Sequence, residues 1–221
     1  FETLTGNKCL VDTFDRNFQF NVEHVSLAKM ADIFLVAPAS ADVIGKIANG
    51  IADDMLTTTI MACKCPKLIS PAMNTNMFTN PIVQDNLKKL EHYGYEIIQP
   101  DSGYLACGDT GAGKMPSEQV LLNYILRTIA KDKDMAGIKL TVTAGPTREK
   151  LDPVRFLSNN STGKMGYAIA KMAMLRGADV TLISGKVSLE PVPFVKMVDI
   201  VSAEDMYNAV IESAKDADII I

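Results

Sequence analysis

Short, unbroken apolar runs that alternate with helical patterns limit the fold of this sequence more than any other feature. The candidate strands are Ile33–Ala37, Lys67–Ser70, Glu96–Gln99, Lys139–Ala144, Asp179–Ser184 and Asp218–Ile221. Strands buried on both faces of a parallel sheet carry such runs, whereas a half-exposed strand alternates polar and apolar residues. The sequence therefore predicts an α/β fold with a doubly wound parallel sheet, flavodoxin-like or Rossmann-like, in three layers.

Several helix ends can be identified from the residues alone. Asn80 followed by Pro81 is typical of an N-cap and first helical position, and Gly94 ends that helix. Ser202 with Asp205 three residues later indicates a capping box. A further helix, from Gly163 to Arg176, carries an apolar stripe that we expect to face the core: Met165, Ile169, Met172 and Ala173.

The strand and helix pattern restarts once along the chain. A helix over Glu118–Ala130 runs into the charged stretch Lys131–Asp134, and a new strand opens at Ile138. A polar, exposed stretch between two α/β patterns is typical of a domain boundary. We therefore expect two domains, 1–133 and 134–221, the second being the opening of a further Rossmann-like domain.

Composition excludes several classes of function. Twenty-two Lys and Arg against twenty-six Asp and Glu give a net charge of −4, and Trp is absent. A nucleic-acid-binding protein normally concentrates basic and aromatic residues, so we expect no nucleic acid partner. We expect no membrane partner, since no apolar run approaches the roughly 20 residues that cross a bilayer. The 4 cysteines at irregular spacing favour a reducing, cytoplasmic compartment. A chain that starts at Phe1 and ends on Ile219–Ile221 is also expected to be part of a longer protein.

Three segments of the first domain carry candidate functional residues. His24 is of a residue type suited to a general base, although a surface or helix-cap histidine is the more common case for such a residue. The Ala37–Asp42 turn follows a buried strand, where small residues let a ligand approach the backbone. Asn74, in the Ser70–Phe78 turn after the next strand, could bind a carboxylate or simply fix the turn.

The Gly-rich stretch Gly103–Pro116 is the richest loop. It resembles a phosphate loop, but Met115 stands where a magnesium-binding Ser or Thr is required. We interpret it as a flexible flap that carries one reactive thiol, Cys107. The other three cysteines lack partners with zinc-ligand spacing, so we expect no metal site and buried or partly buried thiols at Cys9, Cys63 and Cys65.

The second domain offers one nucleotide site. Ser161, Gly163 and Gly166 fall at the start of a helix, where backbone N–H groups and the helix dipole favour phosphate. A dinucleotide fingerprint, G-x-G-x-x-G with an acidic residue about 20 positions later, does not occur, which disfavours a generic NAD oxidoreductase.

Taken together, these motifs resemble the bacterial bifunctional phosphopantothenoylcysteine decarboxylase / phosphopantothenate–cysteine ligase family of coenzyme A synthesis. The first block resembles FMN-dependent cysteine decarboxylases through His24, the Ala37–Asp42 turn, Pro71–Met77 and the Cys107 flap. The second resembles the start of the ligase through 152–166, which includes Asp152–Asn159 and Ser161–Gly166.

The resemblance implies roles in FMN-dependent decarboxylation of 4′-phosphopantothenoylcysteine to 4′-phosphopantetheine. His24 matches the histidine that assists thiol oxidation, and Cys107 matches the cysteine that donates a proton to the intermediate. Asn74 matches the residue that binds the substrate carboxylate, and Met77 matches a substrate contact. The positions that match FMN contacts are Ser40, Ala41, Asp42 and Ala72.

For the ligase, the resemblance implies CTP-dependent joining of 4′-phosphopantothenate to cysteine through an acyl-cytidylate, with Mg²⁺ accompanying CTP. Asn159 matches a catalytic residue and Arg155 a substrate-binding neighbour. Nucleotide phosphates would contact Gly145, Ser161, Gly163 and Gly166.

The family also implies a homo-oligomer, trimer-based through the decarboxylase domain, with FMN at the subunit interface. Its members begin with a strand and a phosphate-binding turn, and continue beyond the ligase opening, so this chain is expected to lack both ends. The alternative is a non-catalytic decarboxylase-like flavoprotein that acts as a regulatory subunit. The joint presence of His24, Asn74 and Cys107 argues against that alternative.

Overall fold

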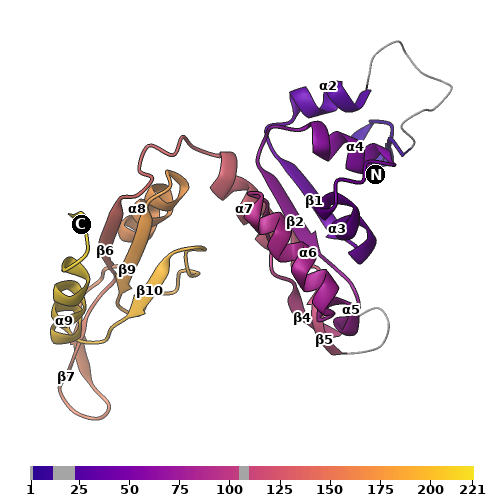
Figure 1. Ribbon diagram of the computed structural model, residues 1–221. Coiled ribbons are helices and arrows are strands. Elements are labelled where there is room, and N and C mark those ends of the chain that lie inside the picture. Colours follow the sequence, from indigo (N-terminus) through magenta and orange to yellow (C-terminus); the bar gives the residue numbers. More distant parts are fainter. Residues whose placement is uncertain (1, 12–22, 105–109) are drawn as a thin grey trace. The chain divides into compact units, whose positions relative to one another are not determined.

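The computed structural model describes residues 2–11, 23–104 and 110–221. The chain divides into two compact units, Phe1–Tyr124 and Ile125–Ile221, which are described separately below (Figure 1). None of the helices in the described ranges is long and apolar enough to cross a membrane.

The first unit is built on a parallel three-stranded sheet in the order β1-β2-β3. Its strands are β1 (Phe34–Ala39), β2 (Lys67–Pro71) and β3 (Glu96–Ile97), so the three apolar runs predicted in this half are strands. The helices are α1 (Glu2–Thr5), α2 (Glu23–Met30), α3 (Ala41–Ala48), α4 (Met55–Ala62), α5 (Thr75–Phe78) and α6 (Pro81–His92), and α7 (Glu118–Ile129) contains the boundary between the two units.

Apolar side chains of α3, α4 and α6 pack on this sheet to form the core of the first unit. The core contains the fully buried Ile44, Ile60 and Ile69, together with Leu90 of α6. The predicted cap of α6 is confirmed, because Asn80 Oδ1 accepts a hydrogen bond from Ile82 N at 2.9 Å. Gly94 follows the helix with a φ of 82°, a left-handed conformation that glycine adopts without strain.

An antiparallel hairpin lies in the Gly-rich stretch for which the sequence predicts a flexible flap. It consists of β4 (Asp101–Tyr104) and β5 (Thr110–Lys114), and Figure 1 shows it beside α5. Its glycines allow close packing: a Cβ on Gly113, whose φ is 131°, would lie 2.1 Å from the carbonyl oxygen of Met73. These short, Gly-rich strands carry no apolar run, and Thr110 is their one β-branched residue, so no sequence pattern indicated them.

The second unit contains a parallel four-stranded sheet in the order β10-β9-β6-β11. Its strands are β6 (Lys139–Ala144), β9 (Asp179–Ser184), β10 (Lys196–Asp199) and β11 (Ile219–Ile220). Three of them were predicted, whereas β10 is a short edge strand without a continuous apolar run. A separate antiparallel hairpin, β7 (Arg148–Lys150) and β8 (Phe156–Ser158), precedes α8 (Lys164–Leu175).

Two helices cover opposite faces of this sheet. Leu140 and Val142 of β6 share a core with α8, whereas Thr141, which points to the other face, hydrogen-bonds through Oγ1 to Ser213 Oγ of α9 (Ala203–Ala214) at 2.6 Å. The result is the three-layer α/β arrangement expected from the sequence. The capping box of α9 is also confirmed, with Asp205 N donating to Ser202 Oγ at 3.1 Å.

The prediction that the apolar stripe of α8 faces the core is wrong for the large residues of that stripe. Met165 and Met172 are 78% and 45% exposed, Ile169 is half-buried, and only Ala173 of that stripe is buried. The buried face consists instead of Gly166, Tyr167, Ala170, Ala173 and Met174. Small residues on this face let the helix backbone approach β6, so residue size rather than hydropathy selects it.

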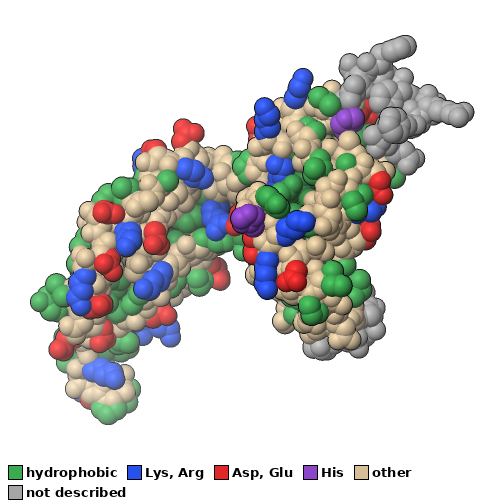
Figure 2. Space-filling view, viewed as in Figure 1, with side chains coloured by type: hydrophobic (Ala, Val, Ile, Leu, Met, Phe, Trp, Pro, Cys, Tyr) green, Lys and Arg blue, Asp and Glu red, His purple; other side chains and the backbone are tan. Residues whose placement is uncertain are grey.

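Charged side chains of both signs occur on each unit over the face drawn in Figure 2. Of the described cysteines, Cys63 is buried and Cys65 is partly buried, as expected. Cys9 is exposed, which corrects the expectation of a buried or partly buried thiol, because its segment of the first unit packs loosely at the surface.

Candidate functional site

Two strand-end turns lie side by side in the first unit. Ser40 is the N-cap of α3, and its Oγ accepts a hydrogen bond from Val43 N at 3.3 Å. In the neighbouring turn, Ala72 N donates to the carbonyl oxygen of Ala39 at 3.0 Å. The structure therefore brings Ser40, Ala41, Asp42 and Ala72 together at the carboxyl ends of β1 and β2, where open α/β sheets bind ligands.

The charge of Asp42 is compensated locally. Lys46 Nζ lies 3.5 Å from Asp42 Oδ2, and also 3.0 Å from Asp53 and 3.6 Å from Asp54. The hydrogen bond to Asp53 raises the pKa of Lys46, against a smaller opposing effect of desolvation. The carboxylate at the start of α3 thus faces a lysine that stays charged at neutral pH.

Asn74 begins α5 and fixes the turn that follows β2. Its Oδ1 accepts a hydrogen bond from Asn76 N at 2.8 Å, so the structure confirms a turn-stabilising role for this side chain. Met77, one turn later, is 48% exposed. Met73, which precedes Asn74, donates a hydrogen bond from its backbone N to Gly113 O at 3.0 Å. This bond joins the turn to the β4–β5 hairpin.

A buried hydroxyl marks the same edge of the sheet. Ser70, at the end of β2, is fully buried, and its Oγ has no hydrogen-bond partner among the described residues. A buried hydroxyl normally has a hydrogen-bond partner, so a ligand or a water molecule can supply the partner at this position.

His24 lies apart from these turns within one chain. It is half-buried at the start of α2, which packs on α4, and Figure 1 shows α2 and α5 at opposite ends of the first unit. The structure therefore does not bring His24 next to Asn74 in a single copy. Cys107 lies outside the described residues.

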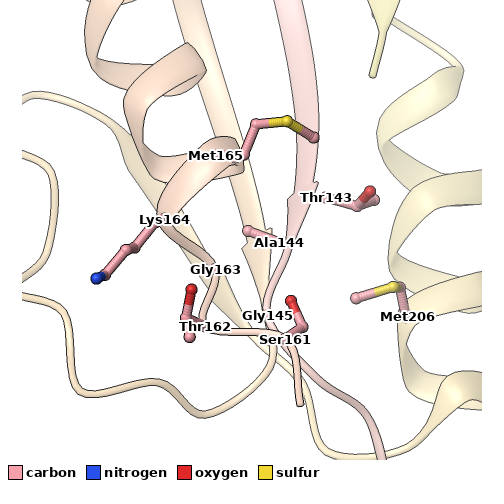
Figure 3. Close-up of a pocket in the computed structure, with 10 residues that line it drawn as sticks. Thr143, Ala144, Gly145, Ser161, Thr162, Gly163, Lys164, Met165 and Met206 are labelled. Carbon is pink, nitrogen blue, oxygen red and sulfur yellow. The ribbon is translucent and has the colours of Figure 1, made fainter. Parts of the chain in front are cut away.

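A pocket of about 260 Å³ lies at the start of α8 in the second unit (Figure 3). All four predicted nucleotide-binding residues line it: Gly145, Ser161, Gly163 and Gly166. Gly163 is the N-cap residue of α8 and has a φ of 74°. Because glycine has no side chain to accept hydrogen bonds from the first turn, a ligand can satisfy these N–H groups. Gly145 also has a φ of 74°, and a Cβ there would lie 2.8 Å from Gly185 O.

Other residues of this pocket were not predicted. They include Thr143, Thr162, Met165 and Met206. In Figure 3, Met206 of α9 lies across the pocket from α8, while the Lys164 side chain extends away from Met206. Met206 is 45 residues from Ser161 in the sequence, so only the tertiary fold could identify it.

The two predicted ligase residues outside the pocket are held by local hydrogen bonds. Asn159 Oδ1 accepts from Ser161 N at 2.9 Å, which places it directly beside the pocket. Arg155 is exposed in the β7–β8 connection, and its Nε donates to Asp152 Oδ2 at 2.6 Å. Hydrogen bonds from the backbone and side chain of Arg155 hold the pKa of Asp152 below its usual range.

Within the described ranges, no three His, Cys, Asp or Glu side chains are grouped so as to hold a metal ion. Cys63 and Cys65 are close enough to interact, and burial, followed by the neighbouring Cys65, raises the pKa of Cys63. Cys63 is therefore a buried, protonated thiol rather than a nucleophile.

Two parts of the chain match two different family models. Residues 1–130 match the family model described as Flavoprotein, more than half of the sequence. The chain belongs to the flavoprotein family. In this flavoprotein, residues 135–221 also match the model described as DNA/pantothenate metabolism flavoprotein C-terminal domain.

Curated relatives of this flavoprotein carry both blocks, which confirms the resemblance identified from the motifs. The coenzyme A biosynthesis bifunctional protein CoaBC of Bacillus subtilis is 44% identical over 224 residues, covering 100% of this chain and 55% of the relative. The protein of the same name from Escherichia coli is 44% identical over 198 residues, covering 90% of this chain and 49% of the relative. The flavoprotein thus spans about half the length of the curated relatives it matches.

A solved structure of a PPC decarboxylase mutant complexed with pantothenoylaminoethenethiol is also similar. It is 35% identical, covers 51% of this chain and 63% of its own, and has a TM-score of 0.48.

Proposed function

We propose that the first unit belongs to an FMN-dependent decarboxylase of coenzyme A biosynthesis, which converts 4′-phosphopantothenoylcysteine to 4′-phosphopantetheine. The observation that carries this proposal is the Ala72 N to Ala39 O bond, which joins the Ser40 and Asn74 turns at one sheet edge. Relatives named for coenzyme A biosynthesis support the assignment.

The residues at this edge suit FMN. Ser40, Ala41, Asp42 and Ala72 surround a helix N-terminus with small side chains, which leaves backbone N–H groups accessible to an anionic or polar cofactor. The Ser70 hydroxyl, which has no hydrogen-bond partner in the described part of the chain, offers a buried polar contact at the end of β2. When bound, FMN would supply the two-electron chemistry that makes loss of carbon dioxide from the substrate possible.

The protein positions the substrate and moves protons. Asn74 would bind the substrate carboxylate, with its amide oriented by the bond from Asn76 N to Oδ1, and Met77 would contact the substrate. His24 would take the proton of the substrate thiol. Cys107 would return a proton to the substrate-derived intermediate.

A homo-oligomer, trimer-based through the decarboxylase domain, accounts for the position of His24. His24 and Asn74 lie at opposite ends of the first unit in one copy, yet the proposed reaction needs both at one substrate. We infer that a second copy supplies His24 to the Asn74 site.

We infer further that the predicted second domain, 134–221, belongs to a CTP-dependent phosphopantothenate–cysteine ligase. The pocket at the start of α8 would bind nucleotide phosphates through Gly145, Ser161, Gly163 and Gly166. In this reaction the phosphopantothenate carboxylate attacks the α-phosphate of CTP and releases pyrophosphate. The cysteine amine then displaces CMP from the acyl-cytidylate. Mg²⁺ would enter with the CTP phosphates.

Asn159 and Arg155 would act beside this nucleotide. Asn159 adjoins the pocket through its bond to Ser161 N, so it lies where the acyl-cytidylate would form. Arg155, on an exposed connection, would contact the acidic substrate.

Flavin binding tests the first proposal. Titration of the whole protein that carries this chain with FMN should quench flavin fluorescence at one FMN per copy. Ala72→Tyr should abolish this quenching by filling the turn, whereas Ala52→Tyr, at an exposed alanine of the same unit, should leave it unchanged. Flavin quenching by Ala72→Tyr as strong as that by Ala52→Tyr and the wild-type protein would show that the Ala72 turn is not part of the flavin site.

A further inference from the structure

A second cavity adjoins the α8 pocket and has a different character. It has a volume of about 400 Å³ and is lined by Arg148, Ser161, Thr162, Lys186, Val187 and Ser188. Ser161 and Thr162 also line the α8 pocket, so the two cavities share a wall.

The lining carries two cations and no carboxylate. Arg148 comes from β7 and Lys186 from the turn after β9, so two separate elements deliver positive charge to one cavity. Hydroxyl groups of Ser161, Thr162 and Ser188 add donors. This combination of guanidinium, ammonium and hydroxyl groups is the donor set of a phosphate site.

Arg148 is fixed in place without a carboxylate partner in the described structure. Its Cζ lies 4.6 Å from the centroid of the Phe156 ring, and its backbone N donates to Val201 O at 2.7 Å. Its Nε is buried and has no hydrogen-bond partner among the described residues. The adjacent carboxylate, Glu149, has another partner, since its Oε1 accepts a hydrogen bond from Ala203 N at 2.8 Å.

Close packing of three turns shapes this region. A Cβ on Gly145 or on Gly163 would lie 2.9 Å from Val187 Cγ1, so the ends of β6 and β9 and the start of α8 meet there. Val187 lies next to Lys186 in the chain. The position of the Lys186 backbone is therefore determined by the same contacts that form the α8 pocket.

We propose that the Arg148–Lys186 cavity is a second anion subsite, which binds a phosphate group beyond the nucleotide pocket. Because the cavities share Ser161 and Thr162, the subsite is suited to the β- and γ-phosphates of a nucleoside triphosphate. It is therefore also suited to pyrophosphate, which consists of these two groups. The phosphate monoester of the acid substrate has the same chemistry and is the other source. This proposal rests on the proposed nucleotide function of the second unit.

The test compares ligands that differ only in phosphate, by calorimetric titration of the whole protein. The probes are inorganic pyrophosphate, CTP against CMP, and 4′-phosphopantothenate against pantothenate. The variants are Lys186→Gln and Arg148→Gln, and Lys171→Gln removes a charge from an exposed site on α8 as the matched control. Lys186 is exposed, so Lys186→Gln should leave the fold intact. This variant therefore tests the proposal even if Arg148→Gln unfolds the hairpin by removing the Arg148–Phe156 contact.

We expect Lys186→Gln and Arg148→Gln each to lower the affinity for pyrophosphate and for CTP about tenfold, which is the effect of losing one charged hydrogen bond. The affinity for CMP should not change. Loss confined to 4′-phosphopantothenate, with pantothenate unchanged, supports the subsite with the acid substrate as its source. Wild-type affinity for every probe in both variants overturns the proposal, as does equal loss for CMP and CTP. If the wild-type protein binds pyrophosphate but neither nucleotide, the nucleotide function fails while the subsite stands.

Discussion

Gly166 of α8 lies directly against Ala144 at the end of β6, with room for no side chain between them. A Cβ on Gly166 would lie 2.6 Å from Ala144 Cβ and 2.9 Å from Thr143 O. The same contact brings the start of α8 to the carboxyl edge of the sheet, where the α8 pocket forms.

Gly166→Ala should destabilise the second unit by about 1–3 kcal/mol, because the added methyl group overpacks a backbone contact. Thermal unfolding of the whole protein measures the effect as a lower midpoint. Gly45→Ala is the control, since a Cβ there meets only Asn86 Nδ2, at 3.8 Å, and alanine is the better helix former. Equal midpoints for Gly166→Ala and the wild-type protein would contradict the close packing.

Cys9 should react with a maleimide much faster than Cys63 in the folded protein. Cys9 is exposed, whereas Cys63 is buried and its raised pKa leaves less thiolate at pH 7.5. Peptide mapping by mass spectrometry after short exposure measures the ratio. Comparable labelling of the two thiols in native protein, and not only in denaturant, would show that Cys63 is accessible.

Asp205→Asn should lower the melting temperature at pH 7 and have a smaller effect near pH 3. The backbone and side-chain hydrogen bonds from Ser202 lower the pKa of Asp205 below its ordinary 3.8. A depressed pKa means that the charged form stabilises the fold above this range, and the contribution is lost as the pH falls through the folded pKa. Glu204→Gln, one residue earlier, removes a charge without a described cap bond. A constant Asp205→Asn effect from pH 7 to pH 3 would exclude the carboxylate as its cause.

Co-expressed His24→Asn and Asn74→Ala variants should recover decarboxylase activity that each lacks alone. In a mixed assembly, some sites combine a native His24 from one copy with a native Asn74 from another. Carbon dioxide release by the purified mixed oligomer measures the recovery. An inactive mixture, with both variants present in one assembly, would place the two residues in a single copy.

Much of the fold follows from local sequence patterns. The continuous apolar runs at Lys139–Ala144 and Asp179–Ser184 are β6 and β9 to the residue. The caps at Asn80 and Ser202 are also present, because capping depends on a side chain and its own helix.

What could not be predicted depends on packing between distant segments. The β4–β5 hairpin rests on glycines that fit against Met73, and the buried face of α8 is chosen by the small Gly166 and Ala170. Met206 lines the α8 pocket through the tertiary fold alone. The sequence likewise grouped His24 with Asn74 by motif, while the fold of one copy separates them.

Carbon dioxide release from 4′-phosphopantothenoylcysteine by the FMN-loaded whole protein tests the central claim most directly. We expect release of one carbon dioxide for each 4′-phosphopantetheine formed, and loss of both products in the Asn74→Ala variant while FMN stays bound. An FMN-loaded, folded protein that releases no carbon dioxide from this substrate would contradict the decarboxylase assignment.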